Sequence, residues 1–137
     1  MTGPHRFDLA VRSSEIDGYG HVNNAVYQQW FEEGREGFLR LGGRDYDWYP
    51  EKLGLLFVVA RVELDFRAAA RRGERGTIST SLTRIGDKSV TFAHEARRDD
   101  GLLWVEGRTV MCWSKDGRAV AVPDDFRTLF ATTPSVD

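Results

Sequence analysis

The sequence predicts an α+β domain in which an antiparallel sheet of about five strands packs against one long helix. Two observations predict this fold class. Apolar residues recur at helical spacing over one long segment only, from Asn24 to Leu41. Most of the remaining chain alternates apolar and polar residues in segments joined by short turns rich in glycine and aspartate. The length of 137 residues suits one domain, so we treat residues 1–137 as a single unit.

The first predicted strand covers Phe7 to Val11, because Phe7, Leu9 and Val11 alternate with polar residues. A glycine-rich turn follows it, with the sequence Asp17-Gly18-Tyr19-Gly20. The turn leads into the run His21-Val22-Asn23-Asn24, where the period changes and the helix begins.

The long helix is predicted to be amphipathic. Its expected buried face holds Val26, Tyr27, Trp30, Phe31, Gly34, Phe38 and Leu41, and its expected solvent face holds Gln28, Gln29, Glu32, Glu33, Arg35 and Glu36. Asn23 or Asn24 is expected to cap its start, and Gly42-Gly43 to end it. Gly34 and Gly37 lower helix propensity, so we expect another backbone to approach the helix closely there.

The second half of the chain is predicted to be mostly strand. The expected elements are strands over 55–66, 76–85, 89–98 and 102–114, followed by a short terminal helix over 123–130. An aromatic segment, Tyr46 to Pro50, is expected to be a loop. One helix leaves part of such a sheet uncovered, so self-association as a dimer or tetramer is expected.

Composition excludes several classes of protein. The formal net charge of −2 argues against a protein that coats nucleic acid or anionic lipid. The single cysteine, Cys112, excludes an internal disulfide and a multi-thiolate metal site, and it suits a reducing compartment. The longest apolar stretch, residues 53–60, is far shorter than the ~20 residues of a membrane span. We therefore expect a cytoplasmic protein that needs no metal and no cofactor.

The run from Asp17 to Tyr27, placed after a strand and at the start of a long helix, resembles the hotdog-fold thioesterases. The 4-hydroxybenzoyl-CoA thioesterase branch is the most similar, and plant acyl-carrier-protein thioesterases share the His-Val-Asn-Asn run. The resemblance extends over nearly the whole chain. It implies a hotdog fold, an oligomer with an acyl-CoA site at the subunit interface, and a catalytic aspartate at Asp17.

The chemistry of thioesters agrees with a carboxylate at this place. Because a thiolate leaves readily near neutral pH, hydrolysis needs a nucleophile or base and a group that holds the oxyanion. Asp17 would either attack the carbonyl or activate a water molecule. The unpaired N–H groups at the helix start near Asn24 would receive the oxyanion.

Each of the other candidate residues has two possible interpretations. His21 would position the carbonyl or orient Asp17, or it is simply a residue of the helix start. Asn23 and Asn24 are helix caps that also suit oxyanion or substrate binding. The plant enzymes carry asparagine where this chain has Tyr19, so their catalytic scheme does not transfer, and Tyr19 becomes a candidate substrate contact.

Basic residues are candidates for the phosphates of CoA. Lys88 and Ser89 resemble the family's strand start beside the pantetheine arm, and they are the substrate-binding candidates. Arg71, Arg72, Arg75, Arg97 and Arg98 are candidates too, although charged hairpin tips are their ordinary interpretation. His94 is expected to be structural and Cys112 to be a small buried hydrophobic residue. The aromatic segment is expected either to cover an acyl chain or to pack at a subunit contact.

Three functions are therefore considered. The leading hypothesis is an acyl-CoA thioesterase that uses Asp17, with acyl carrier protein as the alternative carrier. A hotdog enoyl-CoA hydratase fits less well, because in that family the histidine follows the aspartate by five residues in a run containing Asn-Pro. A hotdog domain that binds acyl-CoA without hydrolysing it is the third, although such a protein has no use for the carboxylate of Asp17.

Overall fold

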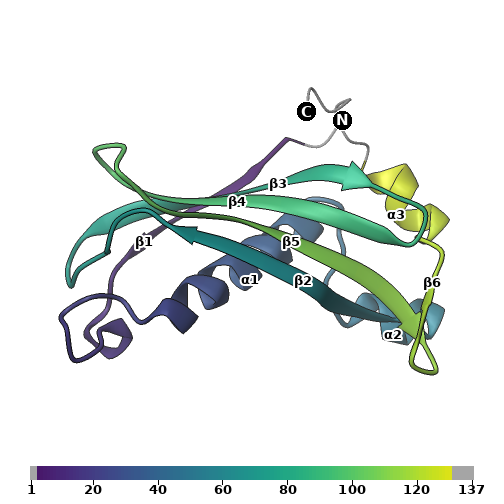
Figure 1. The fold of residues 1–137 in the computed structure, drawn as a ribbon. Coiled ribbons are helices and arrows are strands. Elements are labelled where there is room, and N and C mark those ends of the chain that lie inside the picture. Colours follow the sequence, from purple (N-terminus) through teal and green to yellow (C-terminus); the bar gives the residue numbers. More distant parts are fainter. Residues whose placement is uncertain (1–2, 131–137) are drawn as a thin grey trace.

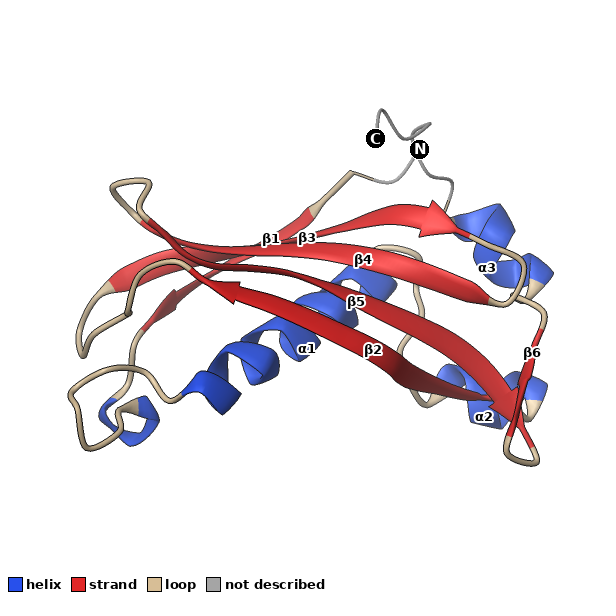
Figure 2. Cartoon of the chain, viewed as in Figure 1, coloured by secondary structure: helices blue, strands red, loops and turns tan. Residues whose placement is uncertain are grey.

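The chain folds into one antiparallel sheet with a long helix against one of its faces (Figures 1 and 2). The computed structural model describes residues 3–130. In chain order the elements are β1 (His5–Ala10), the 3-10 turn η1 (Ser13–Glu15), α1 (Asn24–Arg40), α2 (Trp48–Leu53), β2 (Leu56–Phe66), β3 (Arg75–Ile85), β4 (Ser89–Arg98), β5 (Leu103–Lys115), β6 (Arg118–Val120) and α3 (Asp124–Leu129). The predicted α+β class is confirmed.

The sheet has six strands in the order β1-β3-β4-β5-β2, and the short β6 pairs with β5. Sequence patterning predicted about five strands and missed β6, which is only three residues long. β3, β4 and β5 follow one another through tight turns, whereas β1 and β2 form the edges of the sheet in the described part of the chain. Figure 1 shows α1 running beneath the sheet, while α2 and α3 lie together at one end.

Helix α1 begins and ends close to the predicted positions. Asn23 is its N-cap and accepts a hydrogen bond from the backbone N–H of Ala25 at 2.9 Å. A Cβ atom at Gly34 would collide with Thr80 on β3, and one at Gly37 would collide with His5 on β1. A close approach at both glycines is present, but side chains of the sheet make it rather than the expected backbone, and it lets the helix lie tightly on the sheet.

The predicted faces of α1 need two corrections. Leu41, expected in the core, follows the last helical residue and is 55% exposed. Arg35, expected in solvent, is only 6% exposed and lies under the sheet. Helical periodicity places a side chain on a face but does not show how far a curved sheet extends over that face.

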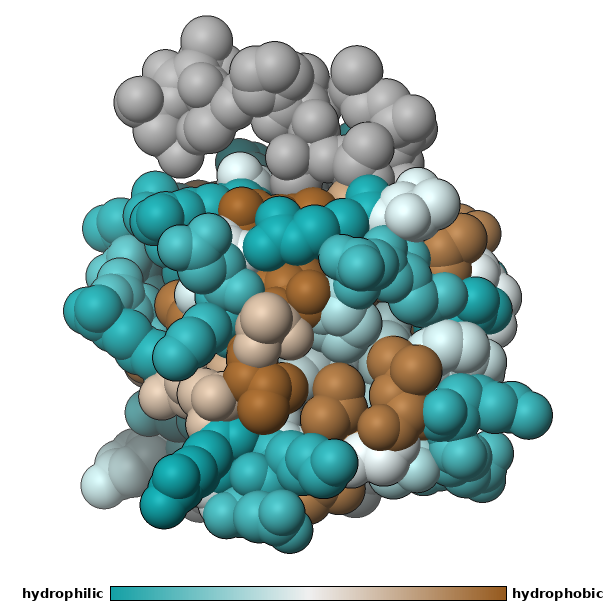
Figure 3. Space-filling view, turned by 90° about the vertical axis from the view of Figure 1, so that its right-hand side faces the viewer, coloured by the Kyte–Doolittle hydropathy of each residue, from teal (hydrophilic) through white to brown (hydrophobic). Residues whose placement is uncertain are grey.

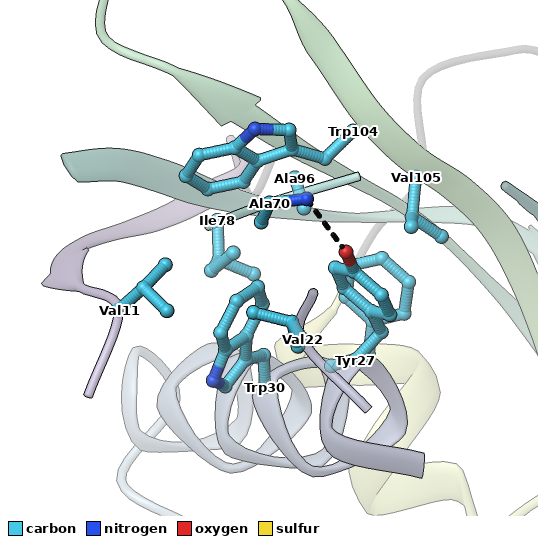
Figure 4. Close-up of a cluster of buried hydrophobic side chains, with 10 residues drawn as sticks. Val11, Val22, Tyr27, Trp30, Ala70, Ile78, Ala96, Trp104 and Val105 are labelled. Atoms are coloured by element: carbon cyan, nitrogen blue, oxygen red, sulfur yellow. Dashed lines mark hydrogen bonds between the residues drawn. The ribbon is translucent and has the colours of Figure 1, made fainter. Parts of the chain in front are cut away.

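The interior consists of two aromatic-rich clusters along the length of α1. The first lies around the start of the helix and contains Tyr27, Trp30 and Trp104 (Figure 4). The second lies around its end and contains Phe38, Tyr49, Trp113, Phe126 and Phe130.

The aromatic segment 46–50 is not a loop throughout, because α2 begins at Trp48. Tyr49 is fully buried in the second cluster, with its ring 5.5 Å from that of Trp113. Its side chain therefore contributes to the core of this subunit and reaches no acyl chain or subunit contact.

Cys112 is partly exposed rather than buried, because it lies on the face of β5 that points away from α1.

Within residues 3–130 no helix is both long enough and apolar enough to cross a bilayer.

Strand β2 is unusually exposed for a strand of eleven residues. Its exposed apolar side chains are Leu56, Val58, Val59, Val62 and Phe66. Figure 3 looks onto the end of the molecule that carries α2, β6 and α3, and hydrophobic side chains reach the surface there between hydrophilic ones. A long apolar edge strand is a surface that a second chain can pair with.

Candidate active site

Asp17 sits in a tight turn that its own carboxylate organises. Its Oδ1 accepts hydrogen bonds from the backbone N–H of Tyr19 at 2.9 Å and of His21 at 3.4 Å. The backbone N–H of Asp17 donates to the carbonyl of His21 at 2.8 Å, which closes the turn. Oδ2 has no partner among the described residues. One carboxylate oxygen is thus held in place, and the other makes no hydrogen bond to the described residues.

Glu15 anchors this turn to the helix. Its side chain is buried and accepts hydrogen bonds from the indole of Trp30 at 2.8 Å and from the backbone N–H of Arg12 at 2.8 Å. Its backbone carbonyl accepts from the N–H of Asn23 at 2.9 Å. Burial by itself raises the pKa of Glu15, but these hydrogen bonds outweigh it and the pKa is lowered. The carboxylate therefore stays ionised while it fixes the turn against α1.

The start of α1 offers a free donor. The N–H of Ala25 is taken by the Asn23 side chain and that of Val26 by the Asn23 carbonyl. The N–H of Asn24 has no acceptor within residues 3–130. An N–H at a helix start carries part of the positive end of the helix dipole, so it suits a negatively charged oxygen.

Asp17 and Asn24 line the same cavity. It has a volume of about 260 Å³, and its lining residues are Asp17, His21, Val22, Asn24, Tyr27, Phe66, Arg67, Ala68 and Ala69. The turn, the first turns of α1 and the end of β2 with its following residues thus surround one space. The cavity places a carboxylate, a helix start and apolar side chains around a molecule that enters it.

Tyr27 forms the inner wall of this cavity. Its hydroxyl accepts a hydrogen bond from the backbone N–H of Ala70 at 3.1 Å (Figure 4). Burial raises the pKa of Tyr27, so the phenol stays protonated. Its ring lies 5.8 Å from that of Phe66. The sequence interpretation gave Tyr27 a core role only, and its amphipathic ring in fact serves both core and cavity.

The structure brings together some of the predicted site residues and separates others. Asp17, His21 and Asn24 share the cavity, whereas Asn23 caps the helix beside it. Tyr19 is 87% exposed at the tip of the turn. Lys88 and Ser89 lie at the other end of the sheet. Ala96 of β4 packs in the same cluster as Tyr27, and the strand runs for about 23 Å between Ser89 and Ala96.

Sequence reasoning missed the part of the cavity that follows β2. Phe66 ends that strand, and Arg67, Ala68 and Ala69 continue from it. Nothing in the local sequence pattern marks these residues. They reach the turn because β2 pairs with β5 and because hydrogen bonds hold the segment there, such as that from the N–H of Val22 to the carbonyl of Ala70 at 2.9 Å.

Among the described residues no group of three or more His, Cys, Asp or Glu side chains could hold a metal ion.

The sequence matches the family model of the thioesterase-like superfamily over residues 11–130, which include the turn, α1 and the whole cavity. The chain belongs to the thioesterase-like superfamily. The expected resemblance to hotdog thioesterases is thereby confirmed, and this superfamily member is a thioester hydrolase.

Individual relatives of this superfamily agree. The chain is 26% identical over 133 residues to the chloroplastic acyl-acyl carrier protein thioesterase ATL3 of Arabidopsis thaliana, which covers 95% of this chain and 69% of that protein. The hypothetical protein TT1821 of Thermus thermophilus shares 32% identity and superposes with a TM-score of 0.81 over 91% of this chain and 96% of that chain.

A more distant solved structure supports the fold alone. It is a mutant 4-hydroxybenzoyl CoA thioesterase complexed with 4-hydroxybenzoyl CoA, at 18% identity. The TM-score is 0.85, over 93% of this chain and 99% of that chain.

Proposed function

We propose that the chain hydrolyses acyl thioesters of CoA to a free acid and CoA thiol, with Asp17 as the reacting carboxylate. One observation carries this proposal: Asp17, whose Oδ2 has no hydrogen-bond partner among the described residues, and Asn24, whose N–H is unpaired there, line the same cavity. Thioester hydrolysis needs these two groups, a nucleophile or base on one side of a carbonyl and a donor for its oxygen on the other.

The reaction begins when the thioester carbonyl enters the cavity between Asp17 and the start of α1. Either Oδ2 attacks the carbonyl carbon, or it takes a proton from a water molecule that attacks instead. The carbonyl oxygen becomes negative and accepts from the N–H of Asn24. The C–S bond then breaks, and the thiolate leaves with the electron pair. It takes the proton back from Asp17 in the water route, and a proton from solvent in the direct route.

The two routes differ in what remains on the enzyme. Direct attack leaves a mixed anhydride between Asp17 and the acyl group, which water hydrolyses in a second step. Water attack leaves no covalent intermediate. Mass spectrometry of the enzyme quenched during a single turnover separates them, because only direct attack adds the mass of the acyl group.

Other residues support the reaction in this proposal. His21 lines the cavity and its backbone closes the Asp17 turn, so it orients the carboxylate. Asn23 holds the helix start in shape, and Tyr19 at the exposed tip contacts the thiol portion of the substrate. Lys88 and Ser89 bind the CoA phosphates across a subunit interface, since within one chain they lie far from Asp17.

Self-association is part of the proposal. Pairing of β2 with β2 of a second copy would cover its apolar side chains and extend the sheet through its open edge. The cavity beside Phe66 and Arg67 opens next to this edge, so a partner subunit would complete its wall. The substrate carrier is CoA or acyl carrier protein in this proposal, because ATL3 is named for acyl carrier protein and the 4-hydroxybenzoyl CoA thioesterase for CoA. The proposed location is the reducing cytoplasm, which suits a chain with the single cysteine Cys112.

A thiol-release assay over a panel of acyl-CoA esters, from aromatic to long-chain, tests the proposal. We expect release of CoA thiol from several esters, and loss of that release in Asp17→Asn. Tight binding of acyl-CoA without any release by the wild-type protein would instead indicate a binding domain.

A further inference from the structure

A second polar site lies under the sheet, between two and three turns of α1 beyond the residues that line the cavity of Asp17. Its centre is Arg35 of α1, which is 6% exposed although the sequence placed it in solvent. Its Nη1 donates to the hydroxyl of Thr109 at 3.1 Å, and its Nε donates to the hydroxyl of Tyr46 at 3.3 Å. Both partners are neutral, so they satisfy hydrogen bonds without balancing the charge.

The neighbouring histidine adds no balancing charge either. His94 Nε2 lies 3.5 Å from Arg35 Nη1 and 3.2 Å from the Thr109 hydroxyl, while Nδ1 lies 3.1 Å from the Thr80 hydroxyl. Burial, together with the charge of Arg35, lowers the pKa of His94 to about 3, so its ring is neutral.

The guanidinium of Arg35 is therefore an uncompensated buried cation. Within residues 3–130 no carboxylate forms an ion pair with it, and its Nη2 has no hydrogen-bond partner. A buried charge is costly without a counter-charge, and a planar guanidinium with free N–H groups matches a carboxylate. Its free N–H groups can therefore receive an anion that enters from outside the chain.

Arg35 faces a cavity between α1 and β2. The cavity has a volume of about 260 Å³ and is lined by Gln28, Gln29, Phe31, Glu32, Arg35, Val59, Val62, Leu64 and Thr109. Its walls are mostly apolar, and the exposed polar side chains of Gln28, Gln29 and Glu32 belong to its rim. An apolar channel that contains one cation suits a hydrocarbon chain with an anionic end.

The two cavities lie end to end along the same pair of surfaces. On α1, Asn24, Tyr27, Phe31 and Arg35 follow one another at helical spacing and so share one face. On β2, the residues that face α1 are Phe66, Leu64 and Val62, and a bulge between Val59 and Arg61 keeps Val59 on that face. The two cavities therefore follow one another along this face of the helix, from Asp17 toward Arg35.

We propose that Arg35 binds a carboxylate at the far end of the acyl chain, so that the preferred substrates are thioesters of long dicarboxylic acids. This inference rests on the proposed thioesterase function. Asn24, whose N–H would hold the thioester oxygen, and Arg35 are eleven residues apart, or about 16 Å along the helix. The other helix residues of the Arg35 cavity all precede Arg35, so its side chain leans back by about one turn, which leaves about 11 Å. An extended chain gains about 1.2 Å per bond, so a diacid of about ten carbons reaches from the thioester to the guanidinium.

Matched thioesters test the inference directly. We expect kcat/KM for decanedioyl-CoA to exceed that for decanoyl-CoA by about tenfold or more, as a charge-assisted hydrogen bond would give. Hexanedioyl-CoA, whose second carboxylate is too short to reach Arg35, should gain nothing over hexanoyl-CoA. Arg35→Met should abolish the preference for the ten-carbon diacid, so that the ratio of kcat/KM for decanedioyl-CoA to that for decanoyl-CoA falls to about one or below.

A second pair of variants keeps the test valid if Arg35→Met does not fold. Glu32 and Glu33 are exposed neighbours on α1, but only Glu32 lines the Arg35 cavity. Glu32→Gln removes a negative charge from the rim and should raise the ratio of kcat/KM for decanedioyl-CoA to that for decanoyl-CoA severalfold. The matched control Glu33→Gln should leave that ratio unchanged.

The outcomes separate this inference from the proposed function. The Arg35 inference is overturned if decanoyl-CoA is hydrolysed well, decanedioyl-CoA is hydrolysed no better, and Glu32→Gln has no effect. The thioesterase proposal then still stands. This kinetic result would also follow if a carboxylate of a second copy of this chain covered Arg35. If no thioester is hydrolysed, calorimetry with decanedioic and decanoic acid still decides, because only the diacid should bind.

Discussion

The indole Nε1 of Trp30 donates a hydrogen bond to Oε2 of Glu15 across 2.8 Å in the protein interior. Glu15 lies two residues before Asp17, and Trp30 lies on the second turn of α1. Through this bond the helix and the turn of Asp17 are held at a fixed separation. In the proposed reaction that separation matters, because Asp17 and the start of α1 must act on the same carbonyl.

Trp30→Phe should loosen the Asp17 turn. The substitution keeps an aromatic ring but leaves the buried carboxylate of Glu15 without one donor, which costs about 1–3 kcal/mol beyond the packing loss. We expect kcat to fall as the turn becomes less ordered. Trp104→Phe is a matched control, because its buried indole N–H has no hydrogen-bond partner. Urea unfolding measures the loss in free energy of unfolding for both variants. A loss for Trp30→Phe no greater than that for Trp104→Phe would contradict this role.

The buried His94 predicts how stability depends on pH. In the unfolded chain its pKa is near the ordinary 6.5, whereas burial and the charge of Arg35 lower it to about 3 in the fold. Between these values the unfolded state binds a proton that the folded state does not. The contribution to stability is therefore full above pH 6.5 and declines as pH falls toward about 3, by at most ~1.4 kcal/mol per pH unit.

His94→Gln removes this titration. We expect the free energy of unfolding of the variant to depend less steeply on pH between 6.5 and 4 than that of the wild type. Urea unfolding at several pH values measures both slopes. Equal slopes would show that His94 does not titrate across that range on unfolding.

The sequence predicted the strands and the long helix well, because both rest on local patterns. The alternation of Thr77, Ile78 and Ser79 marks β3 without any knowledge of its neighbours. β6 lacked such a pattern, since three residues are too few to show a period. The burial of Arg35 also escaped prediction, because a charged residue is expected in solvent unless its neighbours are known.

The candidate site was predicted in the part that is local in sequence. Asp17, His21 and Asn24 are close along the chain, so one turn and one helix start bring them together. Phe66 and Arg67 are some forty residues away and join them through sheet pairing. Lys88 and Ser89 depend on an oligomer, and their role in binding CoA stays a prediction.

Self-association through β2 is open to a direct test. Leu56 and Val58 lie on the face of β2 away from α1 and are both exposed. We expect the wild type to sediment as a dimer or larger, and the double variant Leu56→Lys/Val58→Lys to shift toward monomer, because lysine discourages edge pairing. Leu102→Lys, at an exposed position in the turn before β5, is the control. A monomeric wild type would contradict the proposed interface.

The most direct test of the central claim compares Asp17→Asn with Asp47→Asn in thiol release from the best acyl-CoA. Asp47 is exposed and its side chain makes no capping bond to α2, so it controls for the loss of one charge. Asparagine retains an oxygen for the N–H groups of Tyr19 and His21 but cannot attack or act as a base. The account predicts that Asp17→Asn lowers kcat by about a hundredfold or more, with Tm changed by only a few degrees and Asp47→Asn unaffected. A kcat for Asp17→Asn within a few-fold of the wild type would contradict it.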